Sequence, residues 1–295
     1  MIIFFSEGRL GNQVFQYAFL RTQANKNEKI ISIGMDDLNQ TFIKDRNHIN
    51  FKRIKHSTKL YTLAKILITL LATTRLIRVT KAEREKILGS YTRETTRTKS
   101  RKGLINRINF VETGFFQSDY FFSEEVAAEL AIKPEHLAAP SSFMQKIKSE
   151  KKFFIHIRRG DYLTHTVLGK SALLPLSYFY EAIKQVRERF PQSALIFFSD
   201  DYDFINQHFG HIENIYLSNL TSASEDFACM TLCNGAILSP SSFSWWAAYL
   251  MKSSPDNVYA PQHWLGFNSQ IDYHSSPIPT GYKKIDAIKL EKQDA

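Results

Sequence analysis

Apolar and polar positions alternate in blocks along the C-terminal half of the chain. Continuous apolar runs of strand length occupy residues 151–157, 193–199, 214–218, 235–239 and 257–260. Segments with a helical period lie between them, at residues 176–190 (with Ser177 as N-cap), 201–209, 222–234 and 241–252. Alternating helices and continuous apolar strands are typical of a parallel sheet covered on both faces. The pattern therefore predicts a doubly wound α/β domain.

The N-terminal half has a different pattern, which changes near residue 150. A strand at 1–6, a polar loop at 7–12 and a helix at 13–29 come first. Residues 60–77 form a long apolar helix candidate, and the basic, weakly patterned residues 89–110 predict a loop. We therefore expect two domains, at 1–150 and 151–295.

Composition narrows the class of protein. The chain has 295 residues, 43% of them apolar, which is enough for a real core and excludes a disordered protein. The apolar run of "MIIFFSEG" is too short for a signal peptide and has no basic lead-in. The two cysteines, Cys229 and Cys233, are spaced as two thiols on one helix face rather than as a disulfide, which favours a reducing cytoplasm.

Polar clusters directly follow the predicted strands, where parallel sheets bind ligands. The first is "FIHIRRGDYL", residues 154–163. Strand alternation puts His156 and Arg158 on one face, and a guanidinium can grip a diphosphate with two bonds. Alternatively, Arg159 and Asp161 form a structural salt bridge, and His156 is an ordinary core histidine.

Two further clusters follow the next strands. In "FFSDD", Asp200 and Asp201 could bind a metal, a ribose diol or a helix N-terminus, and Asp201 could simply be an N-cap. In "LSPSSFSWW", Ser241 and Ser242 start a helix, where free N–H groups favour phosphate. Asp226 is either an ordinary first-turn acid or a contact to a base.

A glycine loop, "GRLGNQ" at residues 8–13, separates the first strand from the first helix. It is not a Walker A loop, because no Lys-Ser/Thr follows the glycines. By itself it identifies nothing.

Together, these motifs resemble the α-1,2-fucosyltransferases of glycosyltransferase family 11. The resemblance rests on "GRLGNQVFQYA", "GFFQSDYF", "HIRRGDY", "FFSDD" and "DFACMTLCNGAILSPSSFSWWAAYL". It covers nearly all of residues 151–262 and is poor across 30–110. Arg9 replaces a glycine usual in the family, and Pro240 replaces an asparagine.

The resemblance implies two Rossmann-like domains of GT-B type, an acceptor-side domain at 1–150 and a GDP-sugar domain at 151–295. It implies inverting transfer of L-fucose from GDP-fucose to the 2-hydroxyl of an acceptor sugar, expected to be a galactose, in a bacterial-type surface glycan such as an O-antigen. No metal or other cofactor is implied. The alternative is another nucleotide-sugar glycosyltransferase.

Roles follow by resemblance. Arg158 matches the ligand of the donor diphosphate, and Asp161 is a candidate general base because it leaves the same strand end. The other implied donor-binding residues are Asn12, Arg9, His156, Asp200, Asp201, Asp226, Ser241 and Ser242. In this reading Arg158 and the Ser241 helix start stabilise the leaving diphosphate. A metal recruited by Asp200 and Asp201 is the rival mechanism.

Charge is uneven along the chain. The formal charge is +9, but residues 41–110 alone hold 18 Lys and Arg against 4 Asp and Glu, a net of +14. Nucleic-acid binding is one explanation, but aromatic residues are sparse there and no nucleic-acid motif occurs, so we expect no nucleic-acid partner.

A second explanation involves the apolar helix at 60–77, which Lys52, Arg53, Lys55 and Lys59 precede. Its length approaches a membrane span, but Lys65 and four threonines inside it argue against one. It is either a core helix of the acceptor domain or a helix lying on an anionic inner leaflet. The second reading predicts a cytoplasmic enzyme, peripheral at the membrane, with a lipid-linked oligosaccharide acceptor.

Overall fold

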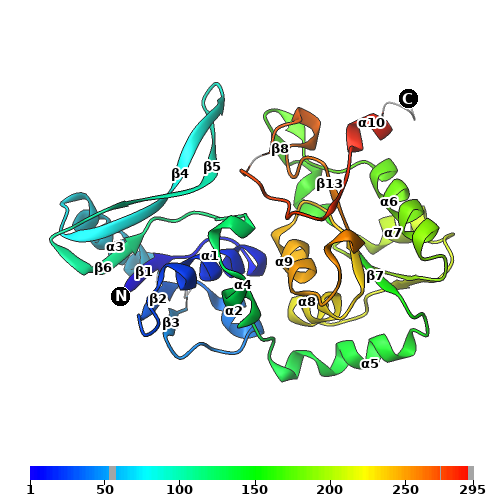
Figure 1. Ribbon diagram of the computed structural model, residues 1–295, viewed down its shortest axis with the longest axis horizontal. Coiled ribbons are helices and arrows are strands. Elements are labelled where there is room, and N and C mark those ends of the chain that lie inside the picture. The colour runs from blue at the N-terminus through cyan, green and yellow to red at the C-terminus, as the bar shows by residue number, and fades with distance from the viewer. Residues whose placement is uncertain (53–57, 273, 292–295) are drawn as a thin grey trace. The chain divides into compact units, whose positions relative to one another are not determined.

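The computed structural model describes residues 1–52, 58–272 and 274–291 and divides into two compact units, Met1–Lys133 and Pro134–Ala295 (Figure 1). Each unit is built on its own six-stranded sheet. Helix α5 (Ala138–Lys146) precedes residue 150, where the sequence pattern changes, but it packs against α8 (Ala223–Thr231) of the second unit. The contacts therefore divide the chain at Lys133 and Pro134.

The second unit contains a wholly parallel sheet in the order β11-β10-β7-β12-β13-β14. The strands are β7 (Lys152–Ile157), β10 (Ala194–Ser199), β11 (Ile215–Leu217), β12 (Gly235–Ile237), β13 (Val258–Pro261) and β14 (Lys283–Ile285). After β7 the chain adds β10 and β11 on one side of that strand. It then crosses to the other side of β7 and adds β12, β13 and β14. Ligands of such sheets bind where the strand order reverses, here between β7 and β12.

Helices cover this sheet as the pattern predicted. They are α6 (Leu176–Arg189), α7 (Tyr202–Phe209), α8, α9 (Ser242–Leu250) and α10 (Ala287–Glu291), and a short hairpin joins β8 (Thr166–Val167) to β9 (Lys170–Ser171). Phe153, Ile155 and Ile157 share one buried core cluster, as the strand alternation predicted. The predicted cap Ser177 is wrong, because α6 starts one residue earlier, at Leu176, after the extended Pro175.

The first unit contains a sheet in the order β3-β2-β1-β6-β4-β5, parallel except for β5. The strands are β1 (Ile2–Phe5), β2 (Ile30–Ile33), β3 (His48–Phe51), β4 (Ile77–Leu88), β5 (Tyr91–Arg101) and β6 (Ile105–Val111). The loop predicted at 89–110 is therefore wrong. β5 is an edge strand of mostly exposed threonines and charged residues, so it lacks the apolar pattern that identifies a half-buried strand.

The helices of the first unit are α1 (Leu10–Gln23), α2 (Asp36–Thr41), α3 (Thr58–Thr73) and α4 (Glu124–Ala128). α3 ends before 77, the last residue of the predicted helix, because β4 starts there and pairs with β6. Its inner face packs on a cluster that includes Phe5, Ile77 and Phe110. Among the described helices, none is long and apolar enough to cross a membrane.

Candidate active site

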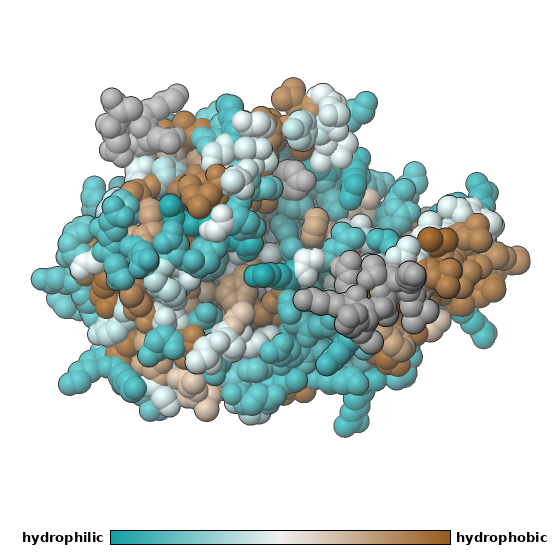
Figure 2. Space-filling model, turned by 180° about the vertical axis from the view of Figure 1, so that it is seen from behind, coloured by the Kyte–Doolittle hydropathy of each residue, from teal (hydrophilic) through white to brown (hydrophobic). Residues whose placement is uncertain are grey.

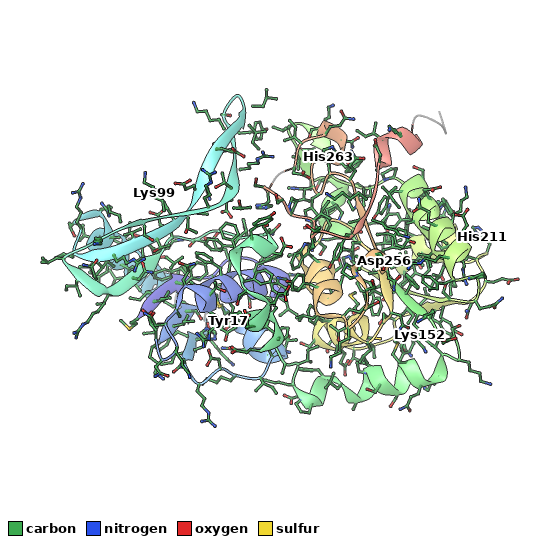
Figure 3. All side chains as sticks on the ribbon, viewed as in Figure 1. Tyr17, Lys99, Lys152, His211, Asp256 and His263 are labelled. Carbon is green, nitrogen blue, oxygen red and sulfur yellow. The ribbon has the colours of Figure 1, made fainter. Side chains whose placement is uncertain are left out.

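The carboxyl ends of three neighbouring strands meet at one edge of the second sheet. β7 lies between β10 and β12, with Ser199 opposite Ile157 and Ile237 opposite Ile155. Lys152, labelled in Figure 3, is the first residue of β7 and marks the opposite edge of the sheet, where the strands begin. The clusters that follow β7, β10 and β12 in the sequence are therefore brought together in space.

Arg158 is held by a two-pronged ion pair. Its Nε and one terminal nitrogen donate to the two carboxylate oxygens of Asp161, each at 2.8 Å. This hydrogen bonding raises the pKa of Arg158 and lowers that of Asp161. The Arg158 side chain remains 31% exposed. The result is a permanent, planar cation whose orientation is fixed and which solvent or a ligand can still reach.

His156 is buried, and its Nδ1 has no hydrogen-bond partner within the part of the chain that the structure describes. Burial, followed by the charge of Arg158, lowers its pKa to about 3. The ring is therefore neutral at physiological pH. Its orphaned nitrogen is unusual for a buried polar atom and indicates a site for a hydrogen-bonding ligand.

Arg159 contacts a different acid from the one the sequence suggested. Its Nε donates to Asp201 at 3.0 Å, and its guanidinium lies 3.6 Å from the ring centroid of Phe204. The proposed Arg159–Asp161 salt bridge is therefore wrong, because Asp161 pairs with Arg158 instead.

The acidic pair is engaged by protein groups. Asp201 caps α7 by accepting the N–H of Phe204 at 3.0 Å, and this bond lowers the pKa of its carboxyl. Asp200 accepts the backbone N–H of Arg159 at 2.9 Å. A Cβ on Gly160 would lie 2.7 Å from Asp200 Oδ2, so only glycine fits there without displacing that carboxylate. Residues 1–52, 58–272 and 274–291 contain no group of three or more His, Cys, Asp or Glu that could hold a metal ion.

The serine turn leaves a buried hydroxyl at the start of α9. Ser241 occupies the N-cap position, but its side chain makes no capping bond. Its Oγ is buried and has no partner among the described residues. Ser242 is the first residue of the helix and is partly exposed. An uncapped helix start with a spare hydroxyl can receive a phosphate oxygen.

Asp226 lies in the first turn of α8, which starts after β11. Ser218 Oγ donates to its carboxylate at 2.5 Å, yet burial raises the pKa of Asp226 to about 6. The carboxyl is therefore more easily protonated than a surface aspartate and can serve as a directed acceptor above that pH.

Ser239, which sequence reasoning missed, connects β12 to β7. Its Oγ donates to the backbone oxygen of His156 at 2.7 Å and accepts the N–H of Arg158 at 3.1 Å. The serine is visible in "ILSPSS" as the first polar residue after an apolar strand, but the prediction named only the two serines after Pro240. The bonds fix the backbone that carries both His156 and Arg158.

The glycine loop belongs to the first unit, where Arg9 is exposed at the N-cap position of α1. Gln13 and Gln16, also missed, hold this loop by donating to Gly8 O and Glu7 O, both at 3.0 Å. Both glutamines are buried in a helix face that is otherwise apolar, which is the signal that could have found them.

Asn12 joins two of the quoted motifs. Its Oδ1 accepts from Gln117 Nε2 at 2.8 Å, which connects the glycine loop to the Gly-aromatic-Gln stretch. Gly8 adopts φ +87°, and a Cβ there would lie 2.3 Å from Asn12 Nδ2. The conformation and the close approach both require glycine.

Doubly wound sheets bind nucleotides where the strand order reverses, and in the second unit an arginine fork lies at that point. The family described as glycosyl transferase family 11 matches residues 3–264, and the chain belongs to that family. It is therefore a glycosyltransferase. This confirms the resemblance and the class of enzyme that the sequence predicted.

Relatives of known name match over different lengths. An α-1,2-colitosyltransferase of Escherichia coli is 24% identical over 95% of this chain and 97% of its own. The O-antigen biosynthesis glycosyltransferase WbnK of Escherichia coli is 31% identical, but this match spans only 39% of the chain and 40% of WbnK. Bovine galactoside 2-alpha-L-fucosyltransferase SEC1 is 29% identical over 34% of the chain and 28% of its own length.

Solved structures share the fold. POFUT1 in complex with GDP has a TM-score of 0.51 at 12% identity and covers 96% of this chain and 98% of its own. A family 9 glycosyl transferase from Veillonella parvula has a TM-score of 0.54 at 13% identity, covering 99% and 88%. The predicted fold class, two Rossmann-like α/β domains of GT-B type, is confirmed.

Proposed function

We propose that the protein transfers L-fucose from GDP-fucose to the 2-hydroxyl of a galactose-type acceptor, with inversion at the anomeric carbon. The observation that carries the proposal is the Arg158–Asp161 fork, which lies at the reversal point of the sheet together with the unpartnered Ser241 hydroxyl. A fixed cation beside an open helix start suits a sugar nucleotide, whose diphosphate is the leaving group.

In the proposed reaction, the bond between the fucose anomeric carbon and the β-phosphate oxygen breaks, and its electron pair stays on the diphosphate. The Arg158 guanidinium, Ser241 Oγ and the free N–H groups of the α9 start stabilise that charge. The acceptor hydroxyl bonds to the opposite face of the anomeric carbon and gives its proton to solvent water, so the configuration inverts.

Asp161 fits the role of a positioning residue better than that of a general base. Both of its oxygens accept hydrogen bonds from Arg158, and this contact lowers the pKa of the carboxyl. Acting as base would require the fork to open. A transition state with much oxocarbenium character needs only weak base assistance, so the reaction can proceed without a strong one.

For the nucleotide, we propose that guanine lies near Asp226 and His156. Guanine presents an N–H and an amino group side by side, which match the acceptor oxygens of one carboxylate. The burial of Asp226 strengthens that hydrogen bonding, and the neutral His156 ring offers a further polar atom. Arg9 and Asn12 remain proposed donor contacts from the glycine loop.

We further propose that no metal takes part. Asp200 and Asp201, the residues that a metal mechanism would use, instead bind the Arg159 backbone, the Arg159 side chain and the α7 start. The protein itself supplies the cation that the leaving group needs.

The acceptor proposal is an oligosaccharide of a bacterial-type surface glycan, lipid-linked during assembly. WbnK, whose name refers to O-antigen biosynthesis, supports the surface glycan, and the name of the α-1,2-colitosyltransferase supports transfer to a 2-hydroxyl. The two cysteines are buried and free, which suits a protein that works in the reducing cytoplasm.

A second candidate donor is favoured by the relative that matches over nearly the whole chain, the α-1,2-colitosyltransferase. Colitose differs from fucose by lacking the 3-hydroxyl, so one donor site can be tested against both. The deciding experiment compares GDP-fucose, GDP-colitose, GDP-mannose and UDP-galactose with a β-galactoside acceptor and determines the product linkage. Fast transfer from GDP-fucose to O2 supports the first proposal, and preference for GDP-colitose replaces it with the second.

A further inference from the structure

Helix α3 exposes an apolar stripe on its outer face. Leu63, Ile66, Leu67 and Leu70 are 62%, 59%, 54% and 56% exposed, and their spacing places them on one side of the helix. The inner face already packs on the sheet through Ala64, Ile68 and Leu71. A surface helix normally turns polar residues outward, so α3 is apolar on two sides. In Figure 2 this stripe contributes to the brown area at the right edge.

A second exposed apolar segment lies beside the C-terminal end of α3. Leu104 and Ile105 donate their backbone N–H groups to Arg75 O at 2.9 Å and Leu76 O at 2.7 Å. The Arg101 side chain donates to Ala72 O at the last turn of the helix. Leu104 is 81% exposed, and it lies among these segments. We call Leu63, Ile66, Leu67, Leu70, Leu76 and Leu104 the α3 patch.

The charged side chains that border the α3 patch at the C-terminal end of the helix are all basic, whereas Lys65 within α3 pairs with Glu7 at 3.4 Å. Arg75, Arg101, Lys102 and Arg107 are exposed in the segments that border it. Residues 58–80 and 95–111 contain no Asp or Glu at all. Of the basic residues that precede the helix, Lys52 is exposed, Arg53 and Lys55 lie outside the described residues, and the side chain of Lys59 is not described. The surface therefore combines leucines with unbalanced cations.

We propose that the α3 patch binds the surface of an anionic lipid bilayer, with α3 lying in the interface. Leucines that enter the acyl boundary and cations that meet lipid phosphates are the two components of such binding. A second copy of the chain would bring like charges together, and a nucleic acid would leave the leucines exposed. The 16 residues of α3 span about 24 Å, short of the roughly 30 Å hydrocarbon core, so the helix lies on the bilayer without crossing it.

This docking does not depend on which sugar is transferred. It deepens the proposed function in one respect, because an enzyme held at the bilayer meets a lipid-linked acceptor in two dimensions. Transfer to a soluble acceptor in detergent-free buffer should be the same with and without the patch.

The test is sedimentation of the full-length protein with vesicles of phosphatidylcholine alone or with about one third phosphatidylglycerol. We expect binding only to the anionic vesicles, weakening as salt rises from low to high concentration because exposed charges are screened. Leu63→Ser with Leu67→Ser should weaken binding at least tenfold, since each leucine loses apolar burial. The matched control is Leu88→Ser, a leucine 60% exposed at the far end of β4.

The charge component is tested separately. Arg75→Gln and Lys102→Gln should each weaken binding to anionic vesicles about fivefold. Lys26→Gln, an exposed lysine on the loop before β2, serves as the control and should change nothing. Thermal melting of each variant verifies that it is folded.

Three results would overturn the proposal: equal binding to neutral and anionic vesicles, no binding to either, or retained binding in the Leu63/Leu67 variant. Self-association that this variant abolishes without lipid would assign the patch to a second copy instead. Vesicle binding without any transfer from GDP-fucose would leave the docking intact and reject the sugar proposal.

Discussion

The two sheets of this protein use their strands differently. In the second unit, short buried strands end together and present Arg158, Asp200 and Ser241 from a rigid edge. In the first unit, the long strands β4 and β5 form an exposed, charged hairpin whose far end extends beyond the other strands (Figure 1). The proposed donor site, which needs fixed geometry, lies on the first kind of strand. The second kind forms exposed, charged surface and supports a neighbouring loop.

The largest effect should come from the rigid edge. Arg158→Lys should lower transfer by a factor of a hundred or more, about 3 kcal/mol, because lysine cannot form the two-pronged contact. Arg159→Lys is the matched control and should be milder, since Arg159 stacks on Phe204 and pairs with Asp201. Initial rates at saturating and low GDP-fucose measure both. Near-normal turnover in Arg158→Lys would remove it from the donor site.

The hairpin gives the next test, on stability. Glu94 of β5 is buried and accepts the N–H groups of Phe115 and Phe116 at 3.0 to 3.3 Å. Glu94→Gln should lower the free energy of unfolding by about 1–3 kcal/mol, because one oxygen becomes a donor facing donors.

Glu85→Gln on the neighbouring strand is the control for this prediction. Glu85 is about half exposed in its ion pair with Arg93, so its loss should cost less than about 1 kcal/mol. Urea unfolding of both variants decides the matter. If the two variants had the same free energy of unfolding, the hairpin would have no part in holding the loop at 114–117.

A pH dependence distinguishes Asp226 from an ordinary surface acid. Its pKa is raised to about 6, so the carboxyl accepts through both oxygens only as pH rises through that value. GDP affinity should therefore rise by up to about tenfold between pH 5 and pH 7. In Asp226→Asn this rise should disappear. Calorimetric titration with GDP at both pH values tests it, and an unchanged pH profile in the variant would place guanine elsewhere.

The raised pKa also affects stability, with a definite sign. The folded state binds this proton more tightly than the unfolded chain does, so the contribution to stability is fully present below the ordinary aspartate pKa. It is lost as pH rises through about 6. Asp226→Asn should remove that loss, which comparing the melting temperatures of the two proteins at pH 5 and pH 7 would detect.

The smallest expected effect is that of a metal chelator on the rate of transfer. Excess EDTA should leave transfer unaltered, because Arg158 and the α9 start supply the positive charge. The control is the same assay after adding magnesium or manganese. A block by EDTA that either ion reverses would reassign Asp200 and Asp201 as metal ligands.

Sequence predicted the second unit well because its strands are continuous apolar runs with polar ends. The same alternation that placed Phe153, Ile155 and Ile157 on one face also placed the clusters at one sheet edge. It could not choose between partners: the spacing of Arg158, Arg159 and Asp161 allowed either arginine to bind Asp161. Only the turn after β7 decides that question.

The first unit was less predictable for a physical reason. β5 has charged residues and threonines on both faces, so its pairing with β4 comes from backbone hydrogen bonds and not from an apolar pattern. Ser239, Gln13 and Gln16 were missed because a single polar residue in apolar surroundings indicates a buried polar side chain but not the group that it binds. Their importance depends on the backbone groups they meet in three dimensions.

Ser239 has a consequence for how the site responds to motion. Its hydroxyl donates to the carbonyl oxygen of His156 and accepts the N–H of Arg158, and so joins β12 to β7 where the strand order reverses. These two hydrogen bonds therefore join the two halves of the sheet at the point where the proposed leaving group would bind. Weaker packing in either half of the sheet should make the orientation of the Arg158 guanidinium less well defined. A substitution in β12 can therefore lower turnover without contacting the donor.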